Sequence, residues 1–165
     1  MAKEEEGRTF DGVVECGWTE IKVGSHPKNR SSQKELRIFG IWGGEAVSLK
    51  IQQKAGLQGG KQMVRQNIEI GSEVMVGSEL KKEFAKDTRI FNAYALSSSY
   101  SSVPPNLLKI FGELTKEIQK LHVPYSKIPL HIAEFVWLYN HPWNSHKEED
   151  EKVHSIIQTL GILKN

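Results

Sequence analysis

The sequence predicts an α/β fold in which a mixed sheet of about five strands is flanked by helices and followed by a helical C-terminal block. Apolar residues alternate with polar ones in the first half of the chain, as they do in strands. In the second half they recur every three or four positions, as they do in helices. With 165 residues, 38% of them hydrophobic, the chain fits one domain rather than two.

Three strands of a meander open the predicted sheet. The apolar residues that define them are Val13, Val14, Cys16 and Trp18, then Leu36, Ile38 and Ile41, then Val47, Leu49 and Ile51. Gly43 and Gly44 supply the turn between the second and third strands, because glycine reaches positive φ without steric cost. A polar loop over 25–32 joins the first two.

The middle of the chain is predicted to alternate helices and strands. A short helix runs through Met63, Val64 and Ile68, and 73–76 reads as a strand. Residues 79–86 form one or two helical turns, and 89–94 is a candidate fifth strand. The serine-rich run 97–102 is interpreted as a flexible connection, since it offers little apolar surface.

Three helices are predicted after Pro104 and Pro105. The first has one apolar face, made of Leu107, Phe111, Leu114, Ile118 and Leu121. The second has Pro129 in its first turn and the apolar residues Ile132, Phe135, Val136 and Tyr139. The third follows a capping-box pair, Ser145 and Glu148, carries Val153, Ile156, Ile157 and Leu160 as a stripe, and ends at Gly161.

Composition limits the classes of function. The chain has 22 Lys and Arg against 20 Asp and Glu, so the net charge of +2 does not by itself indicate nucleic acid or an anionic membrane. No stretch is long and apolar enough for a membrane span, and Met1–Gly7 lacks the pattern of a secretory signal. With Cys16 alone, neither a disulfide within the chain nor a cysteine zinc site forms. We expect an intracellular protein, cytoplasmic or nuclear, that uses no cofactor.

The predicted domain organisation is a flexible acidic tail over 1–10 and a single domain over 11–165. Glutamates at positions 4 to 6 make the first residues polar. The apolar pattern begins only at Val13.

Residues 134–141 read Glu-Phe-Val-Trp-Leu-Tyr-Asn-His. They resemble the Glu-Phe-x-x-Arg-Tyr-Asn-x ending of the Merlin group of DDE DNA transposases and their bacterial insertion-sequence relatives, with Leu138 where arginine is usual. Further matches occur in the same order along 12–141: Val14-Glu15, Thr19, Pro27-Lys28-Asn29, Leu36 to Ile41 and Ile70-Gly71-Ser72. The resemblance implies a ribonuclease H-like domain of the integrase catalytic type.

The same resemblance implies that the catalytic acids are lost. Such transposases cut and join DNA with two divalent cations held by acidic side chains. The first acid and the acid after it correspond to Gly17 and Trp18, and the second corresponds to Gly77 or Ser78. The third, three residues after Asn106, corresponds to Lys109. Glycine offers no ligand atom, and an ammonium group repels a metal ion.

Two features bear on what remains of this site. Glu15 and Glu113 are the nearest carboxylates that could replace the lost ligands, and they keep open an active metal-dependent nuclease with displaced ligands. The indole of Trp18 could instead plug the old cleft.

A basic segment is the candidate nucleic-acid site. Its residues are Lys22, Lys28, Arg30, Lys34 and Arg37. Such a segment can hold phosphates by releasing condensed counterions. Lysines are equally typical of a solvated loop and edge strand, so we expect only weak DNA binding.

The candidate partner-binding residues are Trp137, His141 and Trp143, because aromatic side chains dominate interface energies. The alternative is a structural corner between two helices. No metal site is expected there, since no cysteine completes a zinc ligand set. Cys16 is interpreted as a buried structural residue.

The sequence therefore favours a catalytically inactive, transposase-derived domain that acts as a protein-binding or scaffolding subunit. Its expected partner is another protein or a larger complex, and self-association stays open. The alternatives are a non-catalytic DNA-binding module that uses 22–37 and an active transposase or nuclease.

Overall fold

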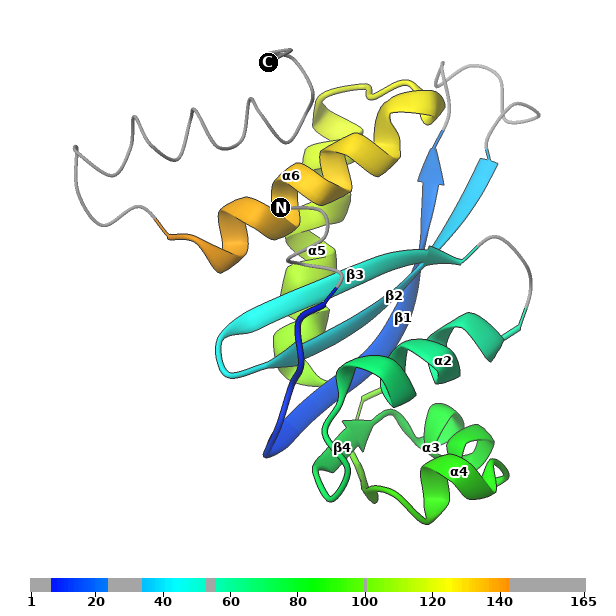
Figure 1. Ribbon diagram of the computed structural model, residues 1–165. Helices are drawn as coiled ribbons and strands as arrows, with labels where there is room; N and C mark the ends of the chain where they lie inside the picture. The colour runs from blue at the N-terminus through cyan, green and yellow to red at the C-terminus, as the bar shows by residue number, and fades with distance from the viewer. Residues whose placement is uncertain (1–6, 24–33, 53–55, 100, 143–165) are drawn as a thin grey trace.

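The structure is a computed structural model that describes residues 7–23, 34–52, 56–99 and 101–142. Its sheet has five strands in the order β3–β2–β1–β4–β5 (Figure 1). The strands are β1 (Val13–Val23), β2 (Lys34–Gly43), β3 (Ala46–Gln52), β4 (Glu73–Val76) and β5 (Ala95–Ser98).

The sheet is mixed, as the sequence predicts. Strands β1, β2 and β3 form an antiparallel meander, with Cys16 opposite Ile41. Strand β4 runs parallel to β1, and β5 runs parallel to β4. Together with the helices below, this is the arrangement of a ribonuclease H-like α/β fold, so the predicted fold class is confirmed.

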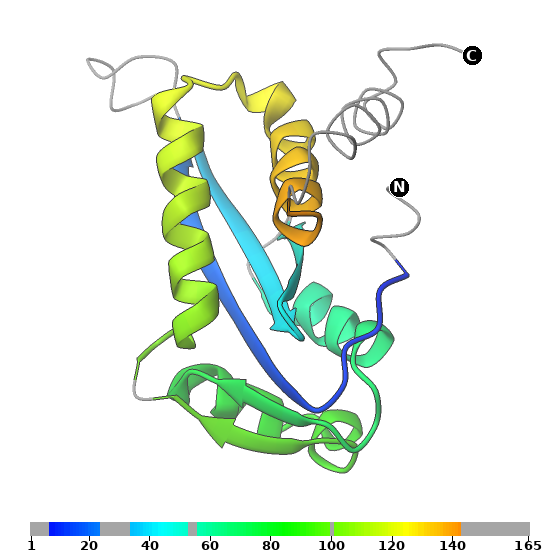
Figure 2. The ribbon, with the colours of Figure 1, turned by 90° about the vertical axis from the view of Figure 1, so that its left-hand side faces the viewer.

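Helices cover both faces of the sheet and enclose two cores (Figure 2). Side chains at alternate positions of β1 enter different cores: Cys16 enters the first and Ile21 the second. The helices of the first core are α2 (Gln58–Asn67), α3 (Ser78–Ala85) and α4 (Thr88–Phe91). Those of the second are α5 (Pro105–Lys120) and α6 (Ile128–Asn140), joined through the short 3₁₀ helix η2 (Tyr125–Lys127).

The predicted helical faces are found in α5 and α6. Leu107, Phe111 and Ile118 of α5 are buried against the sheet, and Pro105 begins that helix. Pro129 lies in the first turn of α6. Leu121 is the exception at 58% exposure, because it follows the last residue of α5.

The prediction of a fifth strand over 89–94 is wrong. Residues Thr88–Phe91 form α4, whose N-cap is Asp87: its carboxylate accepts a hydrogen bond from the backbone N–H of Arg89 at 3.0 Å. Ile90 and Tyr94 are both buried in the first core. Their spacing of four residues suits one side of a helical turn as well as a strand.

The fifth strand instead covers Ala95–Ser98, so the flexible connection predicted over 97–102 is wrong at its start. Ser97 lies opposite Met75, and Ser98 lies opposite Val76. Strand β5 is at the edge of the five-stranded sheet, and its residues are partly or fully exposed, which suits polar side chains.

The domain begins earlier than residue 11. Phe10 is 3% exposed, and its N–H donates to the carbonyl of Asn67 at 2.7 Å. Of the predicted tail, residues 1–6 lie outside the described part of the chain, as do the polar loop over 25–32 and the helix expected after Ser145. Among the described residues, no helix is long and apolar enough to cross a membrane.

Candidate functional site

Gly17 is the position that the resemblance aligns with the first catalytic acid. It lies in the middle of β1 on the face that α5 covers. A Cβ atom placed there would lie 3.2 Å from Cγ1 of Val103, 3.5 Å from Cδ of Pro104 and 3.7 Å from Cδ1 of Leu107. The segment that leads from β5 into α5 therefore packs directly on β1 at this residue. A carboxylate side chain at position 17 would need the space that these apolar groups fill.

Gly77 is the position that the resemblance aligns with the second catalytic acid. It follows β4 and is the N-cap of α3. A Cβ atom there would overlap the carbonyl oxygen of Ser102 and lie 2.7 Å from its carbonyl carbon. The backbone angles, φ −65° and ψ 157°, are open to any residue. Space rather than backbone conformation therefore requires glycine at this position.

The structure thus brings Gly17 and Gly77 against one short segment, 102–104. Lys109 is placed differently. The side chain of Leu107 points at Gly17. Lys109 follows two residues later in the same helix, so its side chain is rotated by about 200° around the helix axis from that of Leu107. Lys109 is accordingly exposed on the side of α5 that faces away from β1.

Glu15 is the buried acid nearest to these positions, with 5% exposure. Its Oε1 accepts a hydrogen bond from the side-chain amide of Asn106 at 2.8 Å, and its Oε2 accepts one from the backbone N–H of Leu107 at 3.0 Å. Helix α5 begins at Pro105 with Pro104 as its N-cap; neither proline has an N–H, and the N-cap makes no side-chain hydrogen bond to the helix. Glu15 therefore caps α5 from β1, where its negative charge also suits the helix N-terminus.

These contacts bear on whether Glu15 or Glu113 is available as a metal ligand. Both oxygens of Glu15 are used as hydrogen-bond acceptors inside the protein. Glu113 is exposed on α5. Within the described ranges, no group of three or more His, Cys, Asp or Glu residues is placed to hold a metal ion.

Trp18 does not fill the space beside Gly17. Its side chain lies on the opposite face of the sheet, where it packs against the first core. The guanidinium of Arg37 covers its ring at 4.3 Å from the centroid. The space at Gly17 is filled by Val103 and Pro104 instead.

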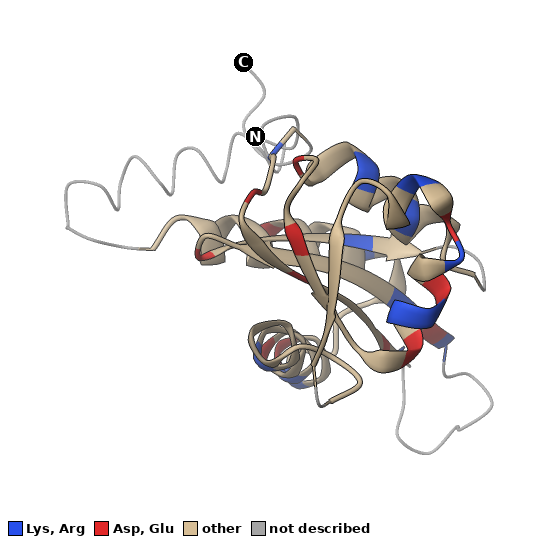
Figure 3. Ribbon diagram, turned by 90° about the horizontal axis from the view of Figure 1, so that it is seen from below, with Lys and Arg blue, Asp and Glu red and all other residues tan. Residues whose placement is uncertain are grey.

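The described part of the basic segment consists of Lys22, Lys34 and Arg37. Arg37 forms an ion pair with Glu20 at 2.6 Å, and the ammonium of Lys34 lies 4.7 Å from the ring centroid of Tyr125. Lys22 lies opposite Glu35 across the two strands. Lys28 and Arg30 lie outside the described residues. Acidic residues therefore interrupt this segment, and Figure 3 shows Lys and Arg interleaved with Asp and Glu elsewhere on the ribbon.

The candidate partner residues are only partly on the surface. Trp137 is 3% exposed, and the ring of His141 stacks on it with a centroid distance of 4.6 Å. The Nδ1 atom of His141 also lies 2.9 Å from the carbonyl oxygen of Trp137. Trp143 lies outside the described residues. In this conformation the indole of Trp137 is not offered to a partner.

The adjacent pair Tyr139 and Asn140 joins α6 to the sheet. The hydroxyl of Tyr139 accepts a hydrogen bond from Nε1 of Trp42 at 3.1 Å. The side-chain oxygen of Asn140 accepts from the N–H of Val47 at 2.8 Å, and its side-chain nitrogen donates to the carbonyl of Val47 at 2.9 Å. Asn140 thus satisfies both backbone groups of one residue on edge strand β3, as a neighbouring strand would.

Cys16 is the buried structural residue that the sequence predicts. Its side chain is inaccessible in the first core. Burial raises the pKa of the thiol well above its usual value, and the negative charge of Glu15 adds to that effect. The neutral thiol is a poor nucleophile.

No family model matches this chain, and no curated protein matches it. The fold and the geometry around Gly17 and Gly77 are therefore the grounds for the functional argument.

Proposed function

We propose that the chain is a transposase-derived, catalytically inactive ribonuclease H-like domain that works as a protein-binding or scaffolding subunit. The resemblance over 12–141 and the strand order of the sheet support the derivation. Fold alone does not determine function, so the proposal depends on the state of the site.

The observation that carries the proposal is the packing of segment 102–104 on Gly17 and Gly77. Two-metal catalysis needs several oxygen ligands around two ions, with room for a phosphate between attacking and leaving groups. Here the corresponding positions have no ligand atoms, and backbone and apolar side chains fill the space beside them. The nearest buried carboxylate, Glu15, is engaged in capping α5.

The DNA-binding alternative has less support from the described residues. A phosphate-binding surface needs cations that are free to approach the backbone of the nucleic acid. Arg37 is already paired with Glu20 and stacked on Trp18. Lys22 has Glu35 as its cross-strand neighbour.

Two measurements on the full chain distinguish a protein scaffold from a DNA-binding module. The first captures the tagged protein from native extract with and without nuclease treatment. We expect a defined set of proteins that stays bound after the nucleic acid is digested. Loss of every bound protein on digestion would contradict the scaffold role.

The second measurement is a salt titration of binding to duplex DNA. We expect a dissociation constant on the order of 10⁻⁴ to 10⁻⁶ M at physiological salt, the range of non-specific contacts. A nanomolar complex that Lys22→Glu with Lys34→Glu abolishes would replace the proposal with the DNA-binding alternative. Lys116→Glu with Lys120→Glu is the matched control, since both lysines are exposed on α5.

A further inference from the structure

Strand β5 leaves one edge of the sheet open. The N–H of Ala95 donates to the carbonyl of Ser72, the residue before β4, at 3.1 Å. Backbone groups alternate in direction along a strand, so the N–H and C=O groups of Leu96 and Ser98 point away from β4. Within the part of the chain that the structure describes, neither of these N–H groups has a hydrogen-bond partner. Figure 2 shows β5 at the lower end of the sheet, with α5 and α6 above it.

The two edges of the sheet differ in how they are covered. At β3, Asn140 occupies both backbone groups of Val47, and α6 packs along the strand. At β5, the residues Ala95–Ser98 include no charged side chain and no proline, which commonly keep edge strands from pairing with other chains. An open, neutral edge of this kind can pair with an added strand.

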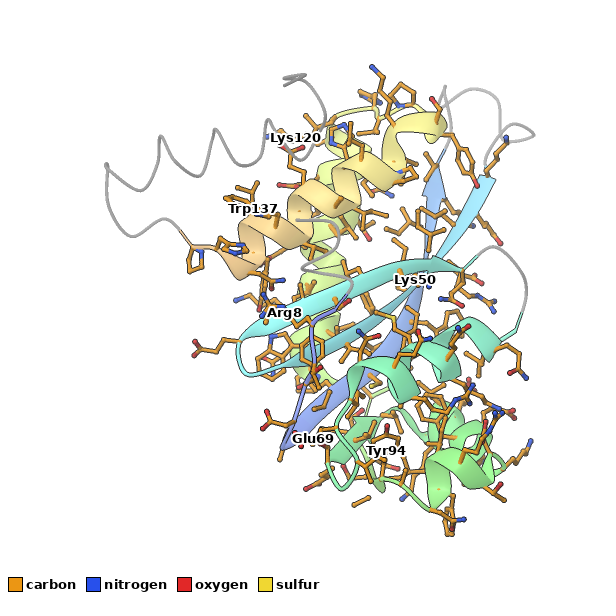
Figure 4. The ribbon with its side chains drawn as sticks, in the orientation of Figure 1. Arg8, Lys50, Glu69, Tyr94, Lys120 and Trp137 are labelled. Atoms are coloured by element: carbon orange, nitrogen blue, oxygen red, sulfur yellow. The ribbon has the colours of Figure 1, made fainter. Side chains whose placement is uncertain are left out.

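The end of α4 limits where an added strand can begin. The N–H of Tyr94 also points outward, but it donates to the carbonyl of Ile90 at 3.1 Å. The next residue, Phe91, is 60% exposed although its ring is large and apolar. Leu96 packs against the first core, which α4 also covers, so an apolar side chain beside Leu96 lies on the same face as Phe91. Figure 4 shows Tyr94 at the end of the molecule away from α6.

The opposite face of β5 presents a carboxylate. Glu73 and Ala95 are partners in the register of β4 and β5, so their side chains lie on the same face. Both residues are exposed, and Glu73 forms no ion pair in the described ranges. A residue on an added strand would lie two strand spacings, or about 10 Å, from Glu73. A Lys or Arg side chain can reach the carboxylate across the small Ala95.

These features favour a peptide segment over a second copy of the chain. Strand β5 has four residues, a length of about 13 Å, and its outward groups allow about four backbone hydrogen bonds. A stable dimer buries roughly 1,200 Å² or more, of which so short an edge is a small part. An extended peptide binds through backbone hydrogen bonds and alternate side chains. Those side chains can contact Phe91 on one face and Glu73 on the other.

We propose that the outer edge of β5 is a docking site for an extended segment of a partner protein, which adds to the sheet as a further strand. The segment places an apolar residue beside Leu96 and a basic residue beside Ala95. This inference rests on the proposed function, because it assigns the protein-binding role to one surface.

Peptide selection on the full-length protein tests this edge. Random linear peptides displayed on phage are selected for binding, and an enriched peptide is synthesised and titrated by fluorescence anisotropy. Ser98→Pro removes one outward N–H, and an edge strand tolerates proline where that N–H is not used by its neighbour. Ser98→Ala is the matched control, because it keeps the N–H. Circular dichroism checks that each variant is folded.

We expect Ser98→Pro to weaken binding of the peptide about tenfold or more, and Ser98→Ala to leave it unchanged. Glu73→Gln should weaken binding by about two- to fivefold. Glu69→Gln should not, because this exposed carboxylate lies outside the register of β4 and β5. N-methylation of the peptide should abolish binding only at alternate residues, since only alternate N–H groups face β5.

The inference is wrong if no peptide is enriched, if Ser98→Pro binds the peptide as well as the native protein, or if N-methylation shows no alternation. A dimer that Ser98→Pro converts to monomer also overturns it, because the occupant is then a second copy. Capture from native extract separates this inference from the proposed function. If Ser98→Pro retains every captured protein, the docking site lies elsewhere and the scaffold role stands.

Discussion

Replacing Gly77 by alanine is expected to destabilise the protein through one added methyl group. The new Cβ would overlap the carbonyl oxygen of Ser102 and lie 2.7 Å from the carbonyl carbon, where ordinary contact begins at 3.4 Å. Backbone of the 102–104 segment must therefore retreat by about 0.7 Å or more, and close-packed interiors resist such shifts. Overpacking of this kind costs about 1–3 kcal/mol, which lowers Tm by roughly 2–12 °C in a domain of this size.

Gly112→Ala is the matched control for that experiment. A Cβ at Gly112, in the middle of α5, would meet no atom within 4 Å. Alanine favours the helix there by about 1 kcal/mol, so Tm should rise by about 2–4 °C. Thermal melts followed by circular dichroism give both values. If Gly77→Ala is as stable as the native protein or more so, segment 102–104 does not close the site as described.

Three further changes are expected to have measurable effects. Glu15→Ala should destabilise the protein by about 1–3 kcal/mol in urea melts, because the N–H of Leu107 loses its buried acceptor. Glu15→Gln should destabilise it less, because one side-chain oxygen remains. Equal losses of stability in the two variants would contradict the capping role. Asn140→Ala should cost about 1–3 kcal/mol through its two bonds to Val47, and an unchanged urea midpoint would show that these bonds add nothing. Cys16 should react with a thiol reagent only after unfolding, and rapid labelling of the native protein at neutral pH would contradict its burial and raised pKa.

The predictable part of the fold is the part set by local pattern. The third strand of the meander follows from the strict alternation of Val47, Leu49 and Ile51, and α5 follows from the spacing of Leu107, Phe111 and Leu114. The strand β5 contains only one large apolar residue, Leu96. It is a strand because it pairs with β4, and that contact between distant residues leaves no periodic signal.

The error over 89–94 has a different cause. Ile90 and Tyr94 fit a strand and a helical turn equally well by spacing alone. The decisive signal was Asp87, an N-cap residue directly before the helix, and it could have been recognised in the sequence.

The site could be predicted only in outline. Residue identity alone shows that Gly17 and Gly77 carry no ligand atoms. That segment 102–104 fills the space beside them depends on contacts between residues far apart in the chain. The capping of α5 by Glu15 likewise joins residues 91 positions apart, and its one local signal is the pair of prolines at the N-cap and first position of the helix.

The most direct test of the account is cleavage of supercoiled plasmid DNA by the pure full-length protein in Mg²⁺ or Mn²⁺. Since Gly17, Gly77 and Lys109 offer no carboxylate ligands, we expect no nicking above that of buffer at any concentration of either metal. Metal-dependent nicking that is lost in Glu15→Gln or in Glu113→Gln would show an active site with displaced ligands, and it would contradict the central claim.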